Sequence, residues 1–205
     1  MQMILKYSLL IFILIFPLIS ISANIKPISL DNFDLIVTST SAQQEKHHEY
    51  LLKSAFLERF TRFVQWPVPF SEINKKEPFI IGVIGPNPFG DILQAVFSRH
   101  PIKEHPVSIR LLNRIEDIQG CHMLFIGKTD DHTLSRIIEF SKKFPVLTVS
   151  DNTGYALKGV HINMYIEEEQ IRFEINNRSA SESGLKISYL LLKVARIVDT
   201  GKGNT

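Results

Sequence analysis

The amino-acid sequence predicts a single layered α/β/α domain, in which a mostly parallel sheet of about four strands is extended by a C-terminal antiparallel hairpin. Three observations indicate this fold class. Short, continuous apolar runs alternate with helical patterns through the middle of the chain, which is typical of parallel strands joined by crossover helices. A stretch of strict apolar and polar alternation follows, as in a hairpin with one polar face. Amphipathic helical patterns stand before and after these segments.

Residues 1–23 have the three-part layout of a secretory signal peptide. Lys6 precedes a run of Leu, Ile and Phe, Pro17 interrupts that run, and the small residues Ser20, Ser22 and Ala23 follow. We expect cleavage after Ser22 or Ala23. The alternative is an uncleaved membrane anchor, because the uncharged stretch approaches the roughly 20 residues that cross a bilayer. The proline and the small residues favour cleavage.

The N-terminal part of the exported chain is predicted to be a mobile arm over 24–42, since it is rich in Ser, Thr, Asn and Asp and has no sustained period. The domain itself is predicted over 43–200. It begins with an amphipathic helix over 43–65, which Trp66-Pro67 ends. The aromatic stripe of this helix is Phe56, Phe60, Phe63 and Trp66. Such a stripe is usually core, but Trp66, at the helix end, is also a candidate contact for a partner.

Four segments are predicted to form the parallel strands, over 79–85, 106–112, 121–126 and 145–149, and the first of them is a continuous apolar run. After the first run, Asn87 is placed to cap a helix, and Pro88 stands at the first helical position, where a missing N–H costs nothing. A second helix lies between the third and fourth segments. Asp130 and Asp131 suit its first turn, because negative charge there complements the helix dipole. Its apolar stripe is Leu134, Ile137, Ile138 and Phe144.

Two alternating stretches, over 160–166 and 171–176, predict the antiparallel hairpin. Its polar face, which includes Asn163 and Arg172, is a candidate surface for a ligand or a partner. The chain then closes with a predicted amphipathic helix. The apolar stripe of that helix is Ile187, Leu190, Leu191, Val194, Ala195 and Val198.

Charge and motifs argue against several functional classes. The formal net charge is only +2, so the chain lacks the strongly basic character of proteins whose main partner is nucleic acid. The Gly-x-Ser-x-Gly elbow of serine hydrolases and the Gly-x-Gly-x-x-Gly dinucleotide fingerprint are both absent. Gly127-Lys128-Thr129 stands between a strand and a helix, but the glycine that a phosphate loop needs five positions earlier is replaced by His122. We therefore predict a protein that is not an enzyme and holds no cofactor.

Cysteine and histidine predict neither a disulfide nor a metal site. Cys121 is the only cysteine, so it cannot form a disulfide within the chain. Its apolar surroundings favour a buried, unreactive thiol, and the alternative is pairing between chains. None of the histidines has a partner at metal-ligand spacing. Surface or capping roles are expected for them, His105 and His161 included.

The best candidate for a binding site is the edge at which the parallel strands end. Ligands of layered α/β proteins bind beyond the carboxyl ends of the strands. Here those ends supply Asn87 and Phe89 after the first strand, Thr129 after the third and Asn152 after the fourth. The alternative is that Asn87 only caps a helix and Asn152 only forms a turn, since Asn is a common turn former.

Several stretches, taken in their order along the chain, carry a family resemblance. They are Ala-Phe-Leu to Val-Gln-Trp-Pro at 55–67, Ile-Gly-Pro-Asn-Pro-Phe-Gly at 84–90, Gly-Cys-His-Met-Leu-Phe-Ile-Gly at 120–127, Pro-Val-Leu-Thr-Val-Ser-Asp at 145–151, Ile-Asn at 162–163, Arg-Phe-Glu-Ile-Asn at 172–176 and Gly-Leu-Lys-Ile-Ser at 184–188. In this order they resemble the YfiR family of exported proteins. The resemblance runs from Lys53 to Val198.

The resemblance implies a periplasmic, non-enzymatic regulator that forms a homodimer. The named member of the family binds the periplasmic part of an inner-membrane diguanylate cyclase and holds it inactive, and an outer-membrane lipoprotein is its expected counterpart, so that cyclic-di-GMP signalling responds to the envelope. That member is associated with disulfide control, which Cys121 alone cannot provide within this chain. The alternative function is a periplasmic small-molecule binding or sensor module that uses the pocket around Asn87 and Asn152.

Overall fold

The computed structural model describes residues 30–68 and 72–200, with side chains from Gln43 onward in these ranges. The predicted signal peptide lies outside the described residues. The chain divides into two units, residues 1–39 and 40–205, and the sheet belongs to the second. Among the helices in the described ranges, none is long and apolar enough to span a membrane.

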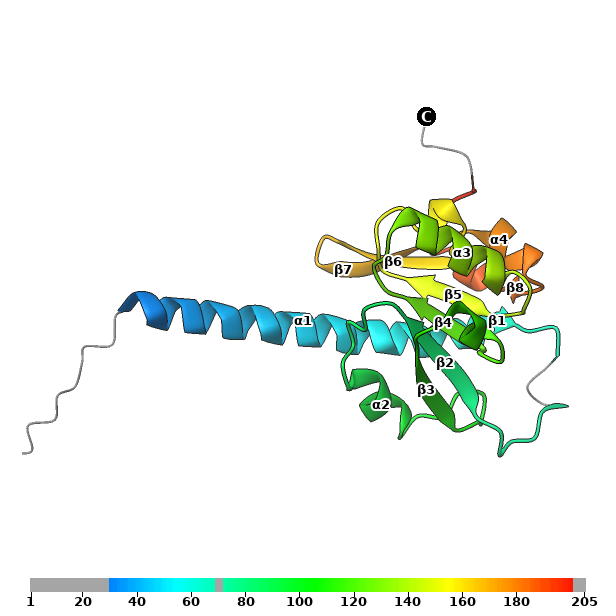
Figure 1. Ribbon diagram of the computed structural model, residues 1–205, viewed down its shortest axis with the longest axis horizontal. Coiled ribbons are helices and arrows are strands. Elements are labelled where there is room, and N and C mark those ends of the chain that lie inside the picture. The colour runs from blue at the N-terminus through cyan, green and yellow to red at the C-terminus, as the bar shows by residue number, and fades with distance from the viewer. Residues whose placement is uncertain (1–29, 69–71, 201–205) are drawn as a thin grey trace, which may run out of the picture. The chain divides into compact units, whose positions relative to one another are not determined.

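A sheet of seven strands forms the centre of the fold (Figure 1). In spatial order the strands are β3 (Val107–Leu112), β2 (Phe79–Ile84), β4 (Met123–Ile126), β5 (Leu147–Ser150), β6 (Ile162–Glu167), β7 (Gln170–Ile175) and β9 (Arg196–Ile197). The strands from β3 to β6 are parallel, β6 and β7 form an antiparallel hairpin, and β9 pairs parallel with β7. The structure therefore confirms the predicted layered α/β fold with a mostly parallel sheet.

Helices and short strands surround this sheet. The helices are α1 (Leu30–Phe63), α2 (Ile92–Phe97), α3 (Asp131–Ser141), α4 (Asn177–Glu182) and α5 (Tyr189–Leu192), with 3-10 turns η2 (Ile115–Ile118) and η3 (Ala156–Lys158). A separate two-stranded sheet pairs β1 (Val64–Gln65) with β8 (Lys186–Ile187). This pairing ends α1 at Phe63, because Val64 and Gln65 are extended to bond β8.

The core lies on both faces of the sheet. All four residues of β4 are buried, and they alternate between two apolar clusters. Phe125 packs in the cluster that contains Leu57 of α1, whereas Leu124 packs in the cluster that contains Leu134 of α3. Residues of a strand point alternately to opposite faces, so α1 and α3 cover opposite sides of the sheet.

The N-terminal helix begins earlier than the sequence pattern indicated. The expected start was residue 43, but α1 begins at Leu30. The Ser- and Thr-rich segment before residue 43 has no apolar period, and the helix continues through it nonetheless. The division into signal peptide, arm and domain stays a prediction.

The predicted C-terminal amphipathic helix is wrong. That segment instead forms β8, the four-residue helix α5 and β9. Ile187 pairs with Val64, and the backbone N–H of Val198 donates to the carbonyl of Ile175 at 3.0 Å. These long-range strand pairings outweigh the local helical period, and Leu190 and Val194 of the predicted stripe are left exposed.

In the hairpin, whether a residue is buried depends on its position along the strands as well as on the face of the sheet to which it points. At its base, Asn163 and Glu174 of the polar face are buried opposite each other. At its tip, Ile166 of the apolar face is 53% exposed. The alternation correctly predicted two paired strands, but it could not show that neighbouring elements cover the polar face near the base.

Candidate functional site

Because β2, β4 and β5 are parallel, their carboxyl ends meet at one edge of the sheet, as the sequence predicted. Asn87 follows β2, Thr129 follows β4 and Asn152 follows β5. This edge therefore collects three of the predicted site residues on three successive loops. Their roles as binding residues stay a prediction.

Asn87 organises its own loop and does not cap a helix. Its side-chain oxygen accepts from the N–H of Phe89 at 3.0 Å, and its side-chain nitrogen donates to the carbonyl of Gly90 at 3.1 Å. Helix α2 begins only at Ile92, after Asp91. The predicted cap at Asn87 is wrong because an Asn side chain can satisfy a tight turn as readily as a helix end.

Phe89 is a core residue of this loop, since only 2% of it is exposed. Its ring meets Tyr50 of α1 edge-on at 5.1 Å and Phe125 of β4 edge-on at 4.8 Å. Phe89 therefore joins the loop after β2 to both the helix and the sheet. This contact holds one wall of the neighbouring cavity in place.

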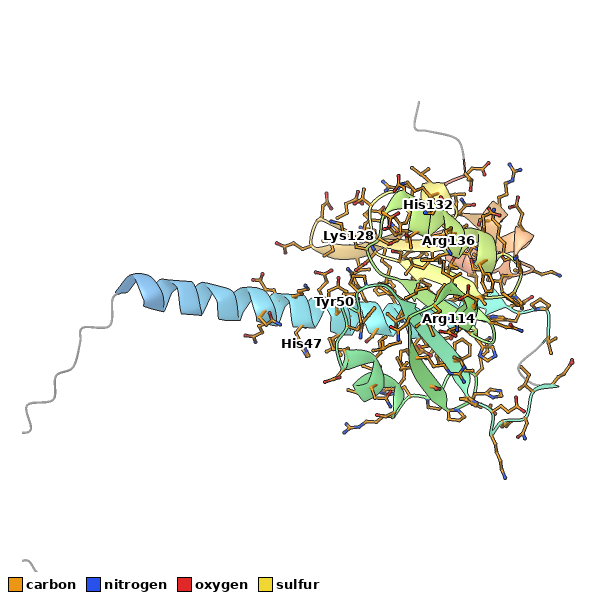
Figure 2. The ribbon with its side chains drawn as sticks, viewed as in Figure 1. His47, Tyr50, Arg114, Lys128, His132 and Arg136 are labelled. Atoms are coloured by element: carbon orange, nitrogen blue, oxygen red, sulfur yellow. The ribbon has the colours of Figure 1, made fainter. Side chains whose placement is uncertain are left out.

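A cavity of about 560 Å³ opens between α1 and the loop after β2. Its lining includes His47 and Tyr50 from α1, both labelled in Figure 2, with Asn87 and Phe89 from the loop. Asn152 is not part of this lining, so the predicted pocket around Asn87 and Asn152 is not a single cavity.

A buried charged cluster lies beside this cavity, and sequence reasoning missed most of it. The Lys53 ammonium donates to Asp151 Oδ2 at 2.6 Å, and the Tyr50 hydroxyl donates to the same oxygen at 2.9 Å. Lys53 also pairs with Glu49, one turn earlier on α1. Only 5% of the Lys53 side chain and 8% of the Asp151 side chain are exposed. The cluster ties α1 to the carboxyl end of β5.

The electrostatics of this cluster keep Tyr50 protonated. Burial, followed by the negative charge of Asp151, raises the pKa of the Tyr50 hydroxyl above its ordinary value. The Lys53 ammonium also lies 4.5 Å from the centre of the Tyr50 ring, a favourable cation–π distance. In the sequence, only the i, i+4 spacing of Glu49 and Lys53 pointed to this cluster. That spacing indicates an ion pair on a helix, but it does not show that the pair is buried.

The loops after β4 and β5 are fastened to each other. The Asn152 side chain donates to Ser150 Oγ at 3.1 Å and to the Ile126 carbonyl at 3.5 Å. The hydroxyl of Tyr155 bonds both the N–H and the carbonyl of Thr129 at 2.9 Å. These contacts agree with the turn interpretation of Asn152, and they fix the backbone of Thr129.

The three remaining predicted site residues lie away from this edge. Trp66 is 8% exposed and packs edge-on against Phe79 at 5.8 Å. Asn163 is buried on the hairpin, and its side-chain oxygen has no hydrogen-bond partner among the described residues. Arg172 is exposed, opposite Tyr165. The structure does not bring these three together.

Two histidines expected at the surface are buried. His161 accepts from the N–H of Thr148 at its Nδ1, at 3.2 Å, and its Nε2 lies 3.2 Å from the hydroxyl of Ser183. Burial lowers the pKa of His161 to about 3, so the ring is neutral. His105 is also buried, with Nδ1 2.9 Å from the carbonyl of Glu77. The surface prediction failed because both rings fill polar gaps between segments distant in sequence.

Cys121 is buried, as predicted, and burial raises the pKa of its thiol. Its sulfur lies 3.7 Å from the carbonyl of Asp117. Within the residues whose side chains are described, no group of three or more His, Cys, Asp or Glu is arranged to hold a metal ion.

Comparison with known proteins gives one family and two distant structures. The family model described as YfiR/HmsC-like matches residues 50–196. Among solved structures, the chain is similar to a conserved domain protein from Vibrio cholerae O1 biovar El Tor, with 12% identity and a TM-score of 0.44 over 58% of this chain and 54% of that chain. It is also similar to the ABC domain of Streptococcus pneumonia in complex with L-Trp, with 12% identity and a TM-score of 0.43 over 58% of this chain and 55% of that chain. The chain thus spans a little over half the length of each solved chain.

Proposed function

Because the chain belongs to the YfiR/HmsC-like family, we propose that it is a periplasmic regulator that acts by protein contact and not by catalysis. Its partner in this proposal is the periplasmic part of an inner-membrane diguanylate cyclase. By binding that part, the protein restrains the cyclase and lowers the production of cyclic-di-GMP. An outer-membrane lipoprotein that relieves this restraint and a homodimeric state belong to the same proposal.

The observation that carries the proposal is a groove between α1 and the tip of the hairpin that exposes aliphatic side chains and has a volume of about 1120 Å³. We name it the α1–hairpin groove and define it by its lining residues, which are 44–52, Ile166, Glu169 and Ile171. Leu51, Leu52 and Ile166 are 42%, 44% and 53% exposed. Three large exposed aliphatic side chains on one groove are typical of a protein-interaction surface.

The rim of the α1–hairpin groove suits a protein partner. Polar and charged side chains line it together with its apolar residues, among them Glu45, Lys46 and Glu169. An apolar centre with a polar rim is the usual anatomy of an interface between soluble proteins. The buried cluster of Lys53 and Asp151 lies beneath this part of α1 and holds the helix against the sheet.

The polar groups of the carboxyl edge support a role other than catalysis. Lys53, Tyr50 and Asp151 are bonded to one another, and the side chains of Lys53 and Asp151 are almost fully buried, which suits a structural link between α1 and β5. A catalytic acid or base needs a titratable group within hydrogen-bond reach of its substrate.

The proposal is tested by genetic complementation. Deleting the gene should raise cellular cyclic-di-GMP, and the wild-type gene should restore it. Leu52→Glu and Ile166→Glu place a charge in the α1–hairpin groove and should fail to restore it. Leu111→Glu is the matched control, because Leu111 is 64% exposed on the edge strand β3 and is not part of the groove.

Two results would contradict the proposal. A deletion that leaves cyclic-di-GMP unchanged would overturn the regulatory role. Groove variants that restore signalling as fully as Leu111→Glu would overturn the α1–hairpin groove as the contact. Circular dichroism of each purified variant shows whether the fold is retained.

Export is tested separately. Mass spectrometry of the protein from the periplasmic fraction should give a chain that begins at Ala23 or Asn24, as cleavage after Ser22 or Ala23 requires. An intact Met1 would contradict cleavage.

A further inference from the structure

We propose that a second cavity, at the carboxyl ends of β2, β3 and β4, binds a small organic carboxylate with an apolar body. We call it the switch-point cavity, because β2 lies between β3 and β4 and the strand order reverses there. In open α/β sheets this reversal is the place where ligands bind. The inference does not depend on the proposed contact with a cyclase, since the α1–hairpin groove shares no lining residue with this cavity.

The switch-point cavity has the size of a small-molecule site. Its volume is about 560 Å³, within the range of roughly 300–1,000 Å³ usual for such sites. Ile84 and Gly85 at the end of β2 line it, together with Leu112 at the end of β3 and Thr129 after β4. The bonds from Tyr155 to the backbone of Thr129 hold the last of these walls in place.

Two guanidinium groups supply the positive charge. Arg114 follows β3 and Arg136 lies on α3, and both line the cavity (Figure 2). Glu116 is the one carboxylate among the lining residues, so the charged side chains of the cavity sum to a net positive charge. Guanidinium groups bind carboxylates through paired hydrogen bonds, and threonine hydroxyls such as that of Thr133 can add another.

Glu116 shows how a carboxylate fits the cavity. The Arg114 Nε donates to Glu116 Oε2 at 3.2 Å, although both side chains are exposed, at 70% and 59%. An exposed pair of this kind contributes little stability, so an incoming carboxylate can replace it at low cost. Arg136 is exposed beside this pair and interacts electrostatically with Glu116, so a carboxylate that displaces Glu116 would face both guanidinium groups.

The walls decide between a carboxylate with an apolar body and a bare inorganic anion. Ile84, Ile115 and Ile137 line the cavity beside the two arginines. Ile84 and Ile137 are buried, but Ile115 is only half-buried, so phosphate would leave its exposed part in contact with water, whereas a ring or a branched chain would cover it. The cavity thus favours an amphipathic monoanion.

The proposal is tested by isothermal titration calorimetry on the purified exported protein. Benzoate is the probe, benzyl alcohol is its neutral counterpart, and inorganic phosphate is the anion without an apolar body. We expect saturable binding of benzoate and weaker or undetectable binding of the other two. Benzyl alcohol or phosphate that binds as well as benzoate would overturn the assigned ligand class, and so would the absence of benzoate binding.

Variants locate the site. Arg136→Gln should weaken benzoate binding by about tenfold or more, because a hydrogen-bonded charge is lost. Glu116→Gln should strengthen it several-fold, because the competing carboxylate is removed. Arg178→Gln is the matched control, since Arg178 is an exposed arginine paired with Glu182 outside the cavity, and its affinity should equal that of the wild type.

Three outcomes among the variants would overturn the site. Unchanged affinity in Arg136→Gln, weaker affinity in Glu116→Gln, or equal losses in Arg136→Gln and Arg178→Gln would each do so. Thermal denaturation confirms that each variant is folded. Amide NMR shifts near Thr129 and Thr133 on adding benzoate should accompany binding to the wild type.

Discussion

At the scale of single residues, the buried pair of Lys53 and Asp151 is the contact that most directly links the helix carrying the groove to the sheet. It joins residues 98 positions apart, and Tyr50 bonds the same carboxylate oxygen. A charge buried in this way is stable only while its partners remain. The position of α1 over the sheet edge therefore depends on a few polar atoms as well as on apolar packing.

We predict that Lys53→Met lowers the free energy of unfolding by about 3 kcal/mol, because it leaves Asp151 buried without its cation. Urea denaturation measures the change. Lys75→Met is the control, because Lys75 pairs with Glu104 where both side chains are mostly exposed, and such pairs contribute little to stability. Equal losses in the two variants would contradict a special role for the buried pair.

His161 should make stability depend on pH. Its pKa is lowered from 6.5 to about 3 in the folded protein, so below pH 6.5 the unfolded chain takes up a proton that the folded chain does not. The contribution of the neutral His161 to the free energy of unfolding is therefore fully present at neutral pH, and it is lost as the pH falls toward 3. Between pH 7 and pH 5 the loss is about 2 kcal/mol.

The comparison with His161→Gln isolates this effect. Urea denaturation at pH 7 and pH 5 should show a smaller loss in the variant than in the wild type, because other titrating groups are common to both. An identical pH dependence in the two proteins would contradict the assignment of a neutral, buried His161.

Trp66→Ala should destabilise the protein by about 3–5 kcal/mol, as expected for removal of a large core side chain. The ring is buried, packs against Phe79 and lies under the ammonium of Lys103. Thermal or urea denaturation tests this. A variant as stable as the wild type would contradict a core role for Trp66.

Residue types alone predicted some of these roles and missed others. Asn152 is a turn residue because its side chain bonds locally, and Cys121 is buried because its neighbours are apolar. Lys53 and His161 could not be recognised, since their partners lie on distant segments. Asp151 follows β5, and Thr148 and Ser183 lie on β5 and after α4. The burial of a polar residue is a tertiary property that composition and period do not contain.

At the scale of elements, the central parallel strands β2, β4 and β5 were predicted well because each is mostly apolar and is covered on both faces, whereas the edge strand β3 is partly exposed. The C-terminal segment was predicted poorly because its helical period competes with pairing to β1 and β7. The predicted start of the first helix at residue 43 was also late, since α1 extends to Leu30 without an apolar stripe to reveal it.

The close approach of β2 and β4 gives a prediction at this scale. A Cβ on Gly127 would lie 2.2 Å from the carbonyl oxygen of Pro86, and backbone cannot move aside as a flexible side chain can. Gly127→Ala should therefore destabilise the protein by at least about 1–3 kcal/mol, the usual cost of overpacking. Gly90→Ala is the control for a glycine in open space, where only its φ of +54° opposes the change.

Urea denaturation and the benzoate titration should both respond to Gly127→Ala. The loops after β2 and β4 border the switch-point cavity, so forcing them apart should weaken the ligand as well as the fold. A Gly127→Ala protein of wild-type stability would contradict the tight contact.

At the scale of the whole molecule, the layered sheet places two kinds of surface on one domain. The α1–hairpin groove offers apolar side chains to a protein partner, and the switch-point cavity offers two arginines to a small anion. The mostly parallel sheet with its antiparallel hairpin and the carboxyl edge followed from the sequence, but the pairing of β9 with β7 did not. The α1–hairpin groove did not, because it is formed by elements far apart in the chain.

Site-specific photo-crosslinking in living cells tests the central claim, regulation by protein contact, most directly. A photoreactive residue is placed at Leu52 in the α1–hairpin groove and, as a control, at Leu111 on β3. The account predicts that position 52, and not position 111, crosslinks to an inner-membrane protein with a cytoplasmic diguanylate cyclase domain. The absence of such a crosslink from position 52, or the same products from both positions, would contradict it.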